Sequence, residues 1–286
     1  MDNALSNWKS IVVFLDDTPE GENVGQRAAD FAERCGAHLI GIHVLPYYFN
    51  EHSSASFARG RQAMHEVVAA QEADGRERAL AAQQRFAAIV AKRPISSEMR
   101  ILRSEQDDDD LVANSRCCDL HVLGYPDPPG LGGSWSADRL LLETGGPMLV
   151  LPIHGKALTV GKRIIVAWNA SREARRAVRD AMPLLSAAES VIILVIDSER
   201  QRHRSRNAAG VDLAHYLGLH GVHVEISQLK SNGSSVADVI LAKTQGEDAD
   251  LVVIGAYSHS WIAEEAFGGV TRTLLANASA PLLLST

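Results

Sequence analysis

The chain has 286 residues, which favours two domains at roughly 150 residues each. Its 28 basic and 35 acidic residues leave a net charge of −7, which argues against a broad nucleic-acid-binding surface. A composition of 46% hydrophobic and 22% charged residues excludes a disordered or fibrous chain, and three cysteines are too few for a disulfide framework.

The first residues show no positively charged region followed by an apolar stretch, so no secretory signal is expected. The longest apolar runs, such as 191–196, are far shorter than the roughly 20 residues of a membrane-spanning helix. We therefore expect a cytoplasmic protein with no membrane and no nucleic-acid partner.

In the first half, short apolar runs alternate with helical patterns, which favours parallel strands joined by crossover helices. The predicted strands are 10–15, 38–45, 98–103, 119–123 and 148–151. Residues 56–92 form a long helical insertion rich in Ala and Gln, which we expect to break at Gly75. A surface helix that covers the sheet is favoured there over a helix that docks a partner.

The second half repeats this alternation. The predicted strands are 163–168, 190–196, 222–228, 250–254 and 281–285, which are rich in Val, Ile and Leu, as in strands covered on both faces. Between the first two, apolar residues recur at helical spacing from Ala174 to Leu185. Ser171 stands where the N-cap of that helix belongs, and Pro183 is expected to kink or end it.

Three segments of the first half recur in the same order in the second. Residues 11–18 resemble 164–171, residues 119–124 resemble 250–255, and residues 147–151 resemble 281–285. We interpret this as a tandem duplication, with one domain at 1–155 and the other at 156–286.

A glycine-containing loop is the most informative motif. Ligands of open parallel sheets bind beyond the carboxyl ends of the strands. Gly255 ends a predicted strand of this kind, and Gly268 and Gly269 open the following helix. Backbone amides at such a helix start can hold an anion or a phosphate group. The alternative is a loop that needs glycine only for its turns.

With these motifs the chain resembles a tandem member of the universal stress protein family over nearly its whole length. Nucleotide-binding members carry Gly, two residues, Gly, nine residues, Gly, and then Ser or Thr. Here the spacing is kept, but Ser258 replaces the second glycine and Gly269 replaces the hydroxyl residue. The resemblance also implies an acidic residue after the first strand, which is Asp16 in the first half and Asn169 in the second.

The resemblance further implies that backbone near the end of the second strand recognises adenine, at Val44 and Val195. The expected ligand is ATP or another adenine nucleotide, with or without Mg²⁺. The expected nucleotide-binding residues are Asn169, Ser171, Val195, Gly255, Ser258, His259, Gly268, Gly269, Val270 and Thr271. The corresponding first-half site is degenerate and consists of Asp16, Thr18, Val44 and Gly124.

The first-half loop departs most from the family pattern. Residues 124–135 contain three prolines, which lack N–H donors, and Trp135 stands where it would crowd a phosphate group. The second half is therefore the favoured nucleotide site.

Other polar clusters are weaker candidates. The basic loop 199–206 is expected to be solvated rather than to contact phosphate, and the acidic run 107–110 to start a helix rather than to hold a metal. Cys117 and Cys118 are expected to be a packed thiol pair rather than a redox switch, and Cys35 to be packed as well.

The predicted fold class is α/β, with two flavodoxin- or Rossmann-like domains related by a pseudo-two-fold axis. Each would hold a five-stranded parallel sheet with helices on both faces. The family resemblance implies that strands 147–151 and 281–285 pair antiparallel within the chain, as a pseudo-dimer. A further homodimer and an unknown protein partner are left open.

The expected function is that of a non-catalytic stress-response protein that binds an adenine nucleotide at the second repeat. A scaffold of the same fold that has lost the ligand is the alternative. No Walker lysine or placed general base is recognisable in the sequence, so at most slow ATP hydrolysis is expected.

Overall fold

The structure is a computed structural model that describes residues 8–45, 58–103, 109–132, 135–153, 160–197, 210–256 and 269–286. Side chains are described from residue 66 onward in the second of these ranges and from residue 111 onward in the third.

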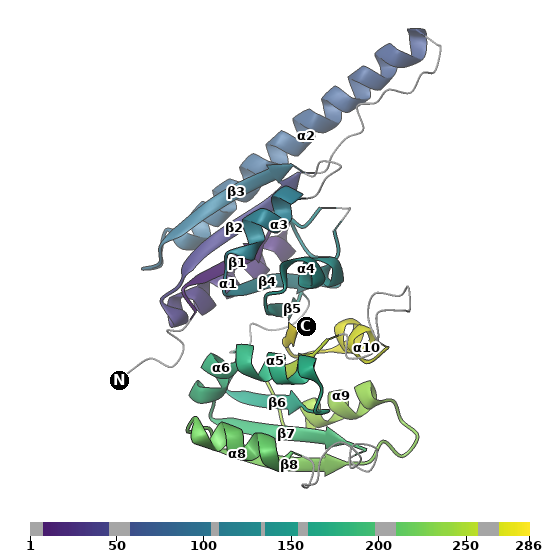
Figure 1. Ribbon diagram of the computed structural model, residues 1–286. Coiled ribbons are helices and arrows are strands. Elements are labelled where there is room, and N and C mark those ends of the chain that lie inside the picture. The colour runs from purple at the N-terminus through teal and green to yellow at the C-terminus, as the bar shows by residue number, and fades with distance from the viewer. Residues whose placement is uncertain are drawn as a thin grey trace.

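Helices and strands alternate through both halves of the chain (Figure 1). The elements of the first half are β1 (Ser10–Phe14), α1 (Pro19–Cys35), β2 (His38–Leu45), α2 (Ala58–Val90), β3 (Ser97–Arg103), α3 (Asp109–Arg116), β4 (Leu120–Tyr125), α4 (Ala137–Thr144) and β5 (Met148–Pro152). Those of the second half are β6 (Arg163–Ala167), α5 (Arg172–Asp180), α6 (Met182–Ala187), β7 (Ser190–Ile196), α8 (Val211–Leu219), β8 (Val224–Leu229), α9 (Val236–Gly246), β9 (Leu251–Gly255), α10 (Gly269–Asn277) and β10 (Leu282–Ser285).

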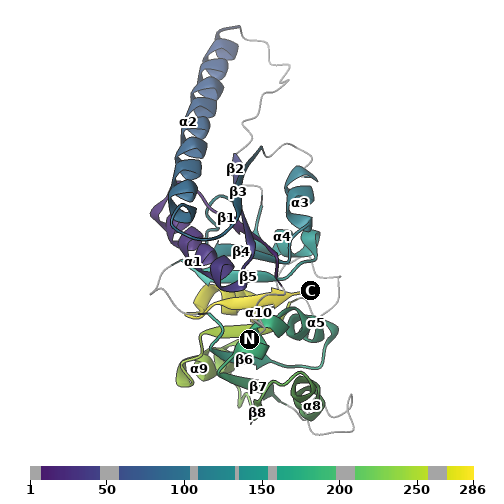
Figure 2. The ribbon, with the colours of Figure 1, turned by 90° about the vertical axis from the view of Figure 1, so that its left-hand side faces the viewer.

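All the described strands form one ten-stranded sheet in the order β3-β2-β1-β4-β5-β10-β9-β6-β7-β8. Each half has the 3-2-1-4-5 order of a Rossmann-type sheet, rather than the order of flavodoxin. The two halves meet at β5 and β10, which lie side by side in Figure 2 and pair antiparallel, with Leu149 opposite Leu283. The predicted fold and the internal pairing of the two last strands are therefore confirmed.

The core consists of two apolar layers, one on each face of the sheet. In β1, Val13 packs toward the face covered by α1, α2, α5, α6 and α8. Its neighbours Val12 and Phe14 pack toward α3, α4, α9 and α10 on the other face. All three side chains are completely buried. This double burial is the reason that the strands read as continuous apolar runs instead of alternating ones.

Helix α2 differs from its prediction. It is continuous from Ala58 to Val90, so the expected break at Gly75 is wrong. A glycine within a helix costs only about 1 kcal/mol relative to alanine, and good helix formers flank this one. The second part of α2 packs on the first half through Phe86 and Ile89, while its first part extends beyond the sheet (Figures 1 and 2).

The predicted effect of Pro183 is confirmed. Helix α5 ends at Asp180 and α6 begins at Met182, so the proline occupies the first turn of a new helix. It needs no N–H partner there. The division of the chain at residues 155 and 156 stays a prediction.

An aspartate holds the start of the first strand in each repeat. The Asp119 carboxylate accepts hydrogen bonds from the amides of Lys9 and Ser10, at 2.7 and 3.0 Å. Asp250 does the same for the amides of residues 161–163. These aspartates occupy matching positions just before β4 and β9, so the duplication extends to side-chain contacts.

The three cysteines are reduced, and one prediction about them is wrong. Cys35 is buried as expected, but Cys117 is exposed and does not form a packed pair with the partly buried Cys118. The Cys118 sulfur lies 3.2 Å from the Ser115 carbonyl and 3.3 Å from His121 Nε2. The chain bends at Cys117, between α3 and β4, which turns successive side chains in different directions.

Candidate ligand sites at the two switch points

Each repeat has one place where the chain leaves neighbouring strands in opposite directions. In the first repeat it lies between the carboxyl ends of β1 and β4, and in the second between those of β6 and β9. Ligands of open α/β sheets bind at such a switch point because the loops diverge there. Asp16 and Gly124 lie at the first switch point, and Asn169 and Gly255 at the second.

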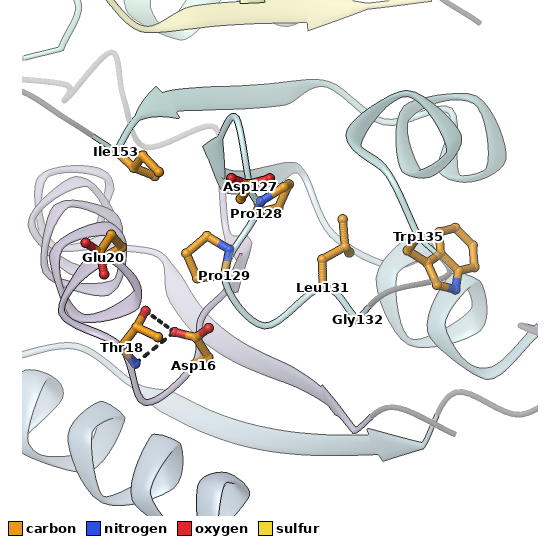
Figure 3. Close-up of a pocket in the computed structure, with 10 residues that line it drawn as sticks. All are labelled: Asp16, Thr18, Glu20, Asp127, Pro128, Pro129, Leu131, Gly132, Trp135 and Ile153. Carbon is orange, nitrogen blue, oxygen red and sulfur yellow. Dashed lines mark hydrogen bonds between the residues drawn. The ribbon is translucent and has the colours of Figure 1, made fainter. Parts of the chain in front are cut away.

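At the first switch point, a short hydrogen-bonded turn holds the Asp16 carboxylate at the start of α1. Its Oδ1 atom accepts from the Thr18 amide at 3.0 Å and from the Thr18 hydroxyl (Figure 3). The Thr18 oxygen in turn caps α1 by accepting from the Gly21 amide at 3.0 Å. A Cβ at Gly21 would lie 2.3 Å from Asp16 Oδ1, so this turn requires glycine.

At the second switch point, the same turn is formed with the side-chain amide of Asn169 in place of the Asp16 carboxylate. Asn169 Oδ1 accepts from the Ser171 amide at 3.0 Å, and Ser171 Oγ accepts from the Ala174 amide at 3.1 Å. The predicted N-cap role of Ser171 is thus confirmed. A Cβ at Gly255 would lie 2.3 Å from the backbone of Glu173 and Ala174, so the first turn of α5 packs directly on the end of β9.

The first switch point is partly occupied by the chain's own loop. The Val44 amide, which the family resemblance assigns to adenine, donates to the Gly130 carbonyl at 2.8 Å. Gly130 has a φ of +76°, and a Cβ there would lie 2.1 Å from the Leu15 carbonyl oxygen. The neighbouring Leu131 is 1% exposed. The prolines had indicated lost N–H donors, but nothing in the sequence indicated that a loop carbonyl would reach β2.

Beside this loop remains a cavity of about 600 Å³ (Figure 3). Its lining residues are Asp16, Thr18, Glu20, Asp127, Pro128, Pro129, Leu131, Gly132, Trp135 and Ile153. Three of them are acidic and none is basic, so the cavity repels a polyphosphate chain. Trp135 lies directly before the α4 N-cap Ser136, and its buried side chain closes the end of the cavity opposite Asp16 and Thr18.

His43 adds no positive charge to this cavity. Its ring is buried, and Nδ1 lies 3.1 Å from the Leu15 carbonyl. Burial lowers the pKa of His43, although the Leu15 contact and the Asp16 charge act in the opposite direction. A neutral imidazole at the end of β2 therefore leaves the acidic character of the cavity unchanged.

The strand register corrects one expected correspondence between the repeats. The amides of Leu15 and Trp168 donate to the carbonyls of Ile42 and Leu194, respectively. Ile42 therefore matches Leu194, and the counterpart of Val44 is Ile196 rather than Val195. Because successive backbone groups of a strand point to opposite sides, the Ile196 amide faces the switch point and the Val195 amide faces β8. The connection between the first two strands is one residue shorter in the second repeat, which sequence similarity alone did not reveal.

The remaining predicted residues of the second site lie around the start of α10. Gly269 begins the helix and is exposed, and a Cβ there would meet no atom of the described residues within 4 Å. Val270 is half-buried and Thr271 is buried in the same turn. Ser258, His259 and Gly268 lie outside the described residues, as does the basic loop 199–206.

The described residues contain no group of three His, Cys, Asp or Glu side chains that could hold a metal ion. Within the same ranges, no helix combines the length and the apolar character that crossing a membrane requires. Helix α3 begins at Asp109, inside the acidic run 107–110, whose first two residues lie outside the described ranges.

Comparison with known proteins finds the same family in both halves of the chain. The model of the universal stress protein family matches residues 7–151 and again residues 161–285. The structure of a universal stress protein from Archaeoglobus fulgidus DSM 4304 is similar with a TM-score of 0.65 and 13% identity, and the match covers 96% of each chain. A functionally unknown protein from Pseudomonas aeruginosa PAO1 is similar with a TM-score of 0.57 and 18% identity, covering 99% of this chain and 94% of that one. Among curated proteins, none matches this chain.

Proposed function

We propose that this chain, which belongs to the universal stress protein family, is a stress-response protein that binds an adenine nucleotide at the switch point of its second repeat. The observation that carries the proposal is the difference between the repeats at the end of the second strand. In the first repeat the Val44 amide is bonded to Gly130, whereas the corresponding Ile196 amide points to the β6 side of β7 and makes no such loop contact within the described residues.

The proposed binding mode uses backbone amides and one side-chain amide. The Ile196 amide would donate to the adenine ring, and Asn169, whose NH₂ group can donate, would bind a ribose hydroxyl or an adenine edge. The phosphate groups would lie at the start of α10, where exposed Gly269 would let a ligand approach the backbone amides of the first turn. Ser258, His259 and Gly268 are expected to complete this end of the site.

The proposal includes no catalytic residue. Asn169 takes the position that the Asp16 carboxylate has in the first repeat, and a side-chain amide cannot act as a general base at neutral pH. The function that we propose is therefore that of a nucleotide sensor or carrier. We expect it to act in the cytoplasm.

A pair of variants at Gly269 tests this proposal. We expect natively purified protein to show copurifying adenine nucleotide by mass spectrometry, and ATP to raise its melting temperature. At a ligand concentration of 100 times Kd, binding adds about 2.7 kcal/mol to the free energy of unfolding. Gly269→Asp should abolish the ATP shift, since a carboxylate at the helix start repels phosphate.

The matched control is Gly269→Asn, which has the same size without the charge. Both side chains have room, and both are favourable at a helix start, so the fold should be kept in each. A melting temperature that ATP does not change in the unmodified protein would reject nucleotide binding.

The second candidate is a scaffold that has lost the ligand. The partly occupied first switch point favours it, because the Val44 amide there is bonded to the chain's own loop instead of being free for a ligand. A scaffold should show no copurifying nucleotide, and ATP should not change its melting temperature. It should capture a protein partner, and Gly269→Asp should not weaken that interaction.

A further inference from the structure

The segments that follow the first strand of each repeat have opposite charge. Residues 16–26 include four acidic residues and no basic one, whereas the matching residues 169–179 include four arginines and one glutamate. The two segments adopt the same turn and the same helix start, so the inversion concerns charge and not backbone geometry.

In the first repeat, long helix α2 neutralises the outer part of this charge. Arg78 lies 3.2 Å from Asp17, and Arg85 lies 2.6 Å from Glu22. Asp16 remains at the cavity together with Glu20.

In the second repeat, two of the later arginines of α5 are also engaged elsewhere. The Arg175 guanidinium lies over the Tyr216 ring at 4.8 Å, and Arg176 pairs with Asp180 at 2.9 Å. Arg172, the first residue of α5, has a side chain that is 96% exposed and contacts Glu173 at 3.4 Å. It is three residues from Asn169 and takes the place that Pro19 occupies in the first repeat.

The oxygen donors near Asn169 do not suit a magnesium ion. Mg²⁺ is held in proteins mainly by carboxylates, with near-ideal octahedral geometry. Asn169 offers a neutral oxygen that already accepts from the Ser171 amide. The nearby Glu173 side chain is only 13% exposed, and its long 3.4 Å contact leaves the Arg172 side chain almost fully exposed. Among the described residues near Asn169, the groups that would compensate phosphate charge are therefore cationic side chains rather than metal ligands.

From this arrangement we propose that the second repeat binds its nucleotide without a divalent cation, with Arg172 supplying the positive charge that faces the phosphate groups. The inference rests on the proposed function and deepens it by naming the ionic form of the ligand. Free ATP or ADP is bound directly, and the replacement of Asp16 by Asn169 in the second repeat is what removes the requirement for metal.

The test measures ATP affinity by isothermal titration calorimetry, once in excess Mg²⁺ and once in EDTA. For the unmodified protein we expect dissociation constants within about twofold of each other, since the site itself provides the cation. Arg172→Pro should weaken binding in EDTA by about tenfold or more, the effect of losing one charge-assisted contact. Proline is tolerated at a first helical position, as Pro19 shows in the first repeat.

Two further variants separate this inference from simpler explanations. Arg179→Gln removes a charge from the last turn of the same helix and should change affinity less than twofold. Asn169→Asp restores the carboxylate of the first repeat and should make binding stronger in Mg²⁺ than in EDTA.

The outcomes are distinct. Binding that needs Mg²⁺ in the unmodified protein, or equal losses in Arg172→Pro and Arg179→Gln, would overturn the inference while leaving nucleotide binding intact. No ATP binding in either buffer would reject the proposed function and the inference together.

Discussion

The Val44 amide donates a hydrogen bond to the Gly130 carbonyl at 2.8 Å, and no described residue makes the corresponding contact with Ile196 in the second repeat. This hydrogen bond joins the end of β2 to the proline-rich loop of the first repeat. In the second repeat, the corresponding backbone amide is that of Ile196, which faces the switch point. In the first repeat, part of the switch point is thus occupied by an internal contact of the chain. The remaining acidic cavity shows how far the first repeat has diverged.

The stability of the first repeat should depend on glycine at position 130. Gly130→Ala places a Cβ 2.1 Å from the Leu15 carbonyl oxygen, in backbone with a φ of +76°. We expect the free energy of unfolding to fall by about 2–4 kcal/mol, from strain and clash together. Urea denaturation measures the effect.

Gly36→Ala is the matched control, because Gly36 has a φ of +64° but a Cβ there would meet no atom within 4 Å. It should cost only the left-handed conformation, about 1 kcal/mol. Equal losses in the two variants would show that the loop does not press against β1.

Two buried histidines should make the protein less stable in mild acid. Burial lowers the pKa of His121, whose Nε2 lies 2.9 Å from the Ser115 carbonyl, and likewise lowers that of His43. Below about pH 6.5 the unfolded chain binds protons that the native state does not. The free energy of unfolding should therefore fall with decreasing pH, by at most about 1.4 kcal/mol per pH unit for each histidine.

Denaturation series between pH 7.5 and 5 measure this slope. His121→Gln should reduce it, whereas His215→Gln, which replaces an exposed histidine of α8, should not. The same slope in all three proteins would mean that His121 is not the origin of the acid sensitivity.

One thiol should react much faster than the other two. Cys117 is exposed, whereas burial raises the pKa of Cys118 to about 12 and that of Cys35 to about 11. Only the thiolate is nucleophilic, so at pH 8 a maleimide or disulfide reagent should modify Cys117 first. Mass spectrometry of the native protein should find one rapid modification, absent from Cys117→Ser. Rapid labelling of Cys118 would show that its thiol is not buried in the folded protein.

The aspartate before β9 should be important for the stability of the second repeat. Asp250 is 7% exposed and accepts from the amides of Gly161, Lys162 and Arg163. Asp250→Ala leaves these donors without their partner, so we expect a loss of about 2–4 kcal/mol. Asp250→Asn keeps one acceptor oxygen and should lose less. Thermal unfolding followed by circular dichroism compares them, and an Asn variant as unstable as Ala would point to lost charge instead of lost acceptors.

Several elements could be predicted because their signals are local. The Ser171 cap follows from a hydroxyl directly before a helical pattern, and the end of α5 follows from Pro183. The expected break of α2 at Gly75 was wrong, although its signal was also local. The helix propensity of the surrounding residues outweighs the cost of one glycine.

Position in the sequence could not decide which backbone groups meet. The counterpart of Val44 is Ile196 and not Val195, because the register is set by hydrogen bonds between strands and not by residue similarity. In the same way, the charge near each switch point depends on partners from other helices. Arg78 and Arg85 of α2 neutralise Asp17 and Glu22, and no pattern within α1 indicates this.

The amino-acid sequence by itself determined the duplication and the two α/β repeats, because hydrophobic periodicity and helix caps act over a few neighbouring residues. Only the tertiary structure decided that the Gly130 carbonyl accepts from the Val44 amide and that Ile196, not Val195, is the counterpart of Val44. The physical reason is that hydrogen bonds and ion pairs between distant segments form only when packing of the whole sheet has brought those segments together.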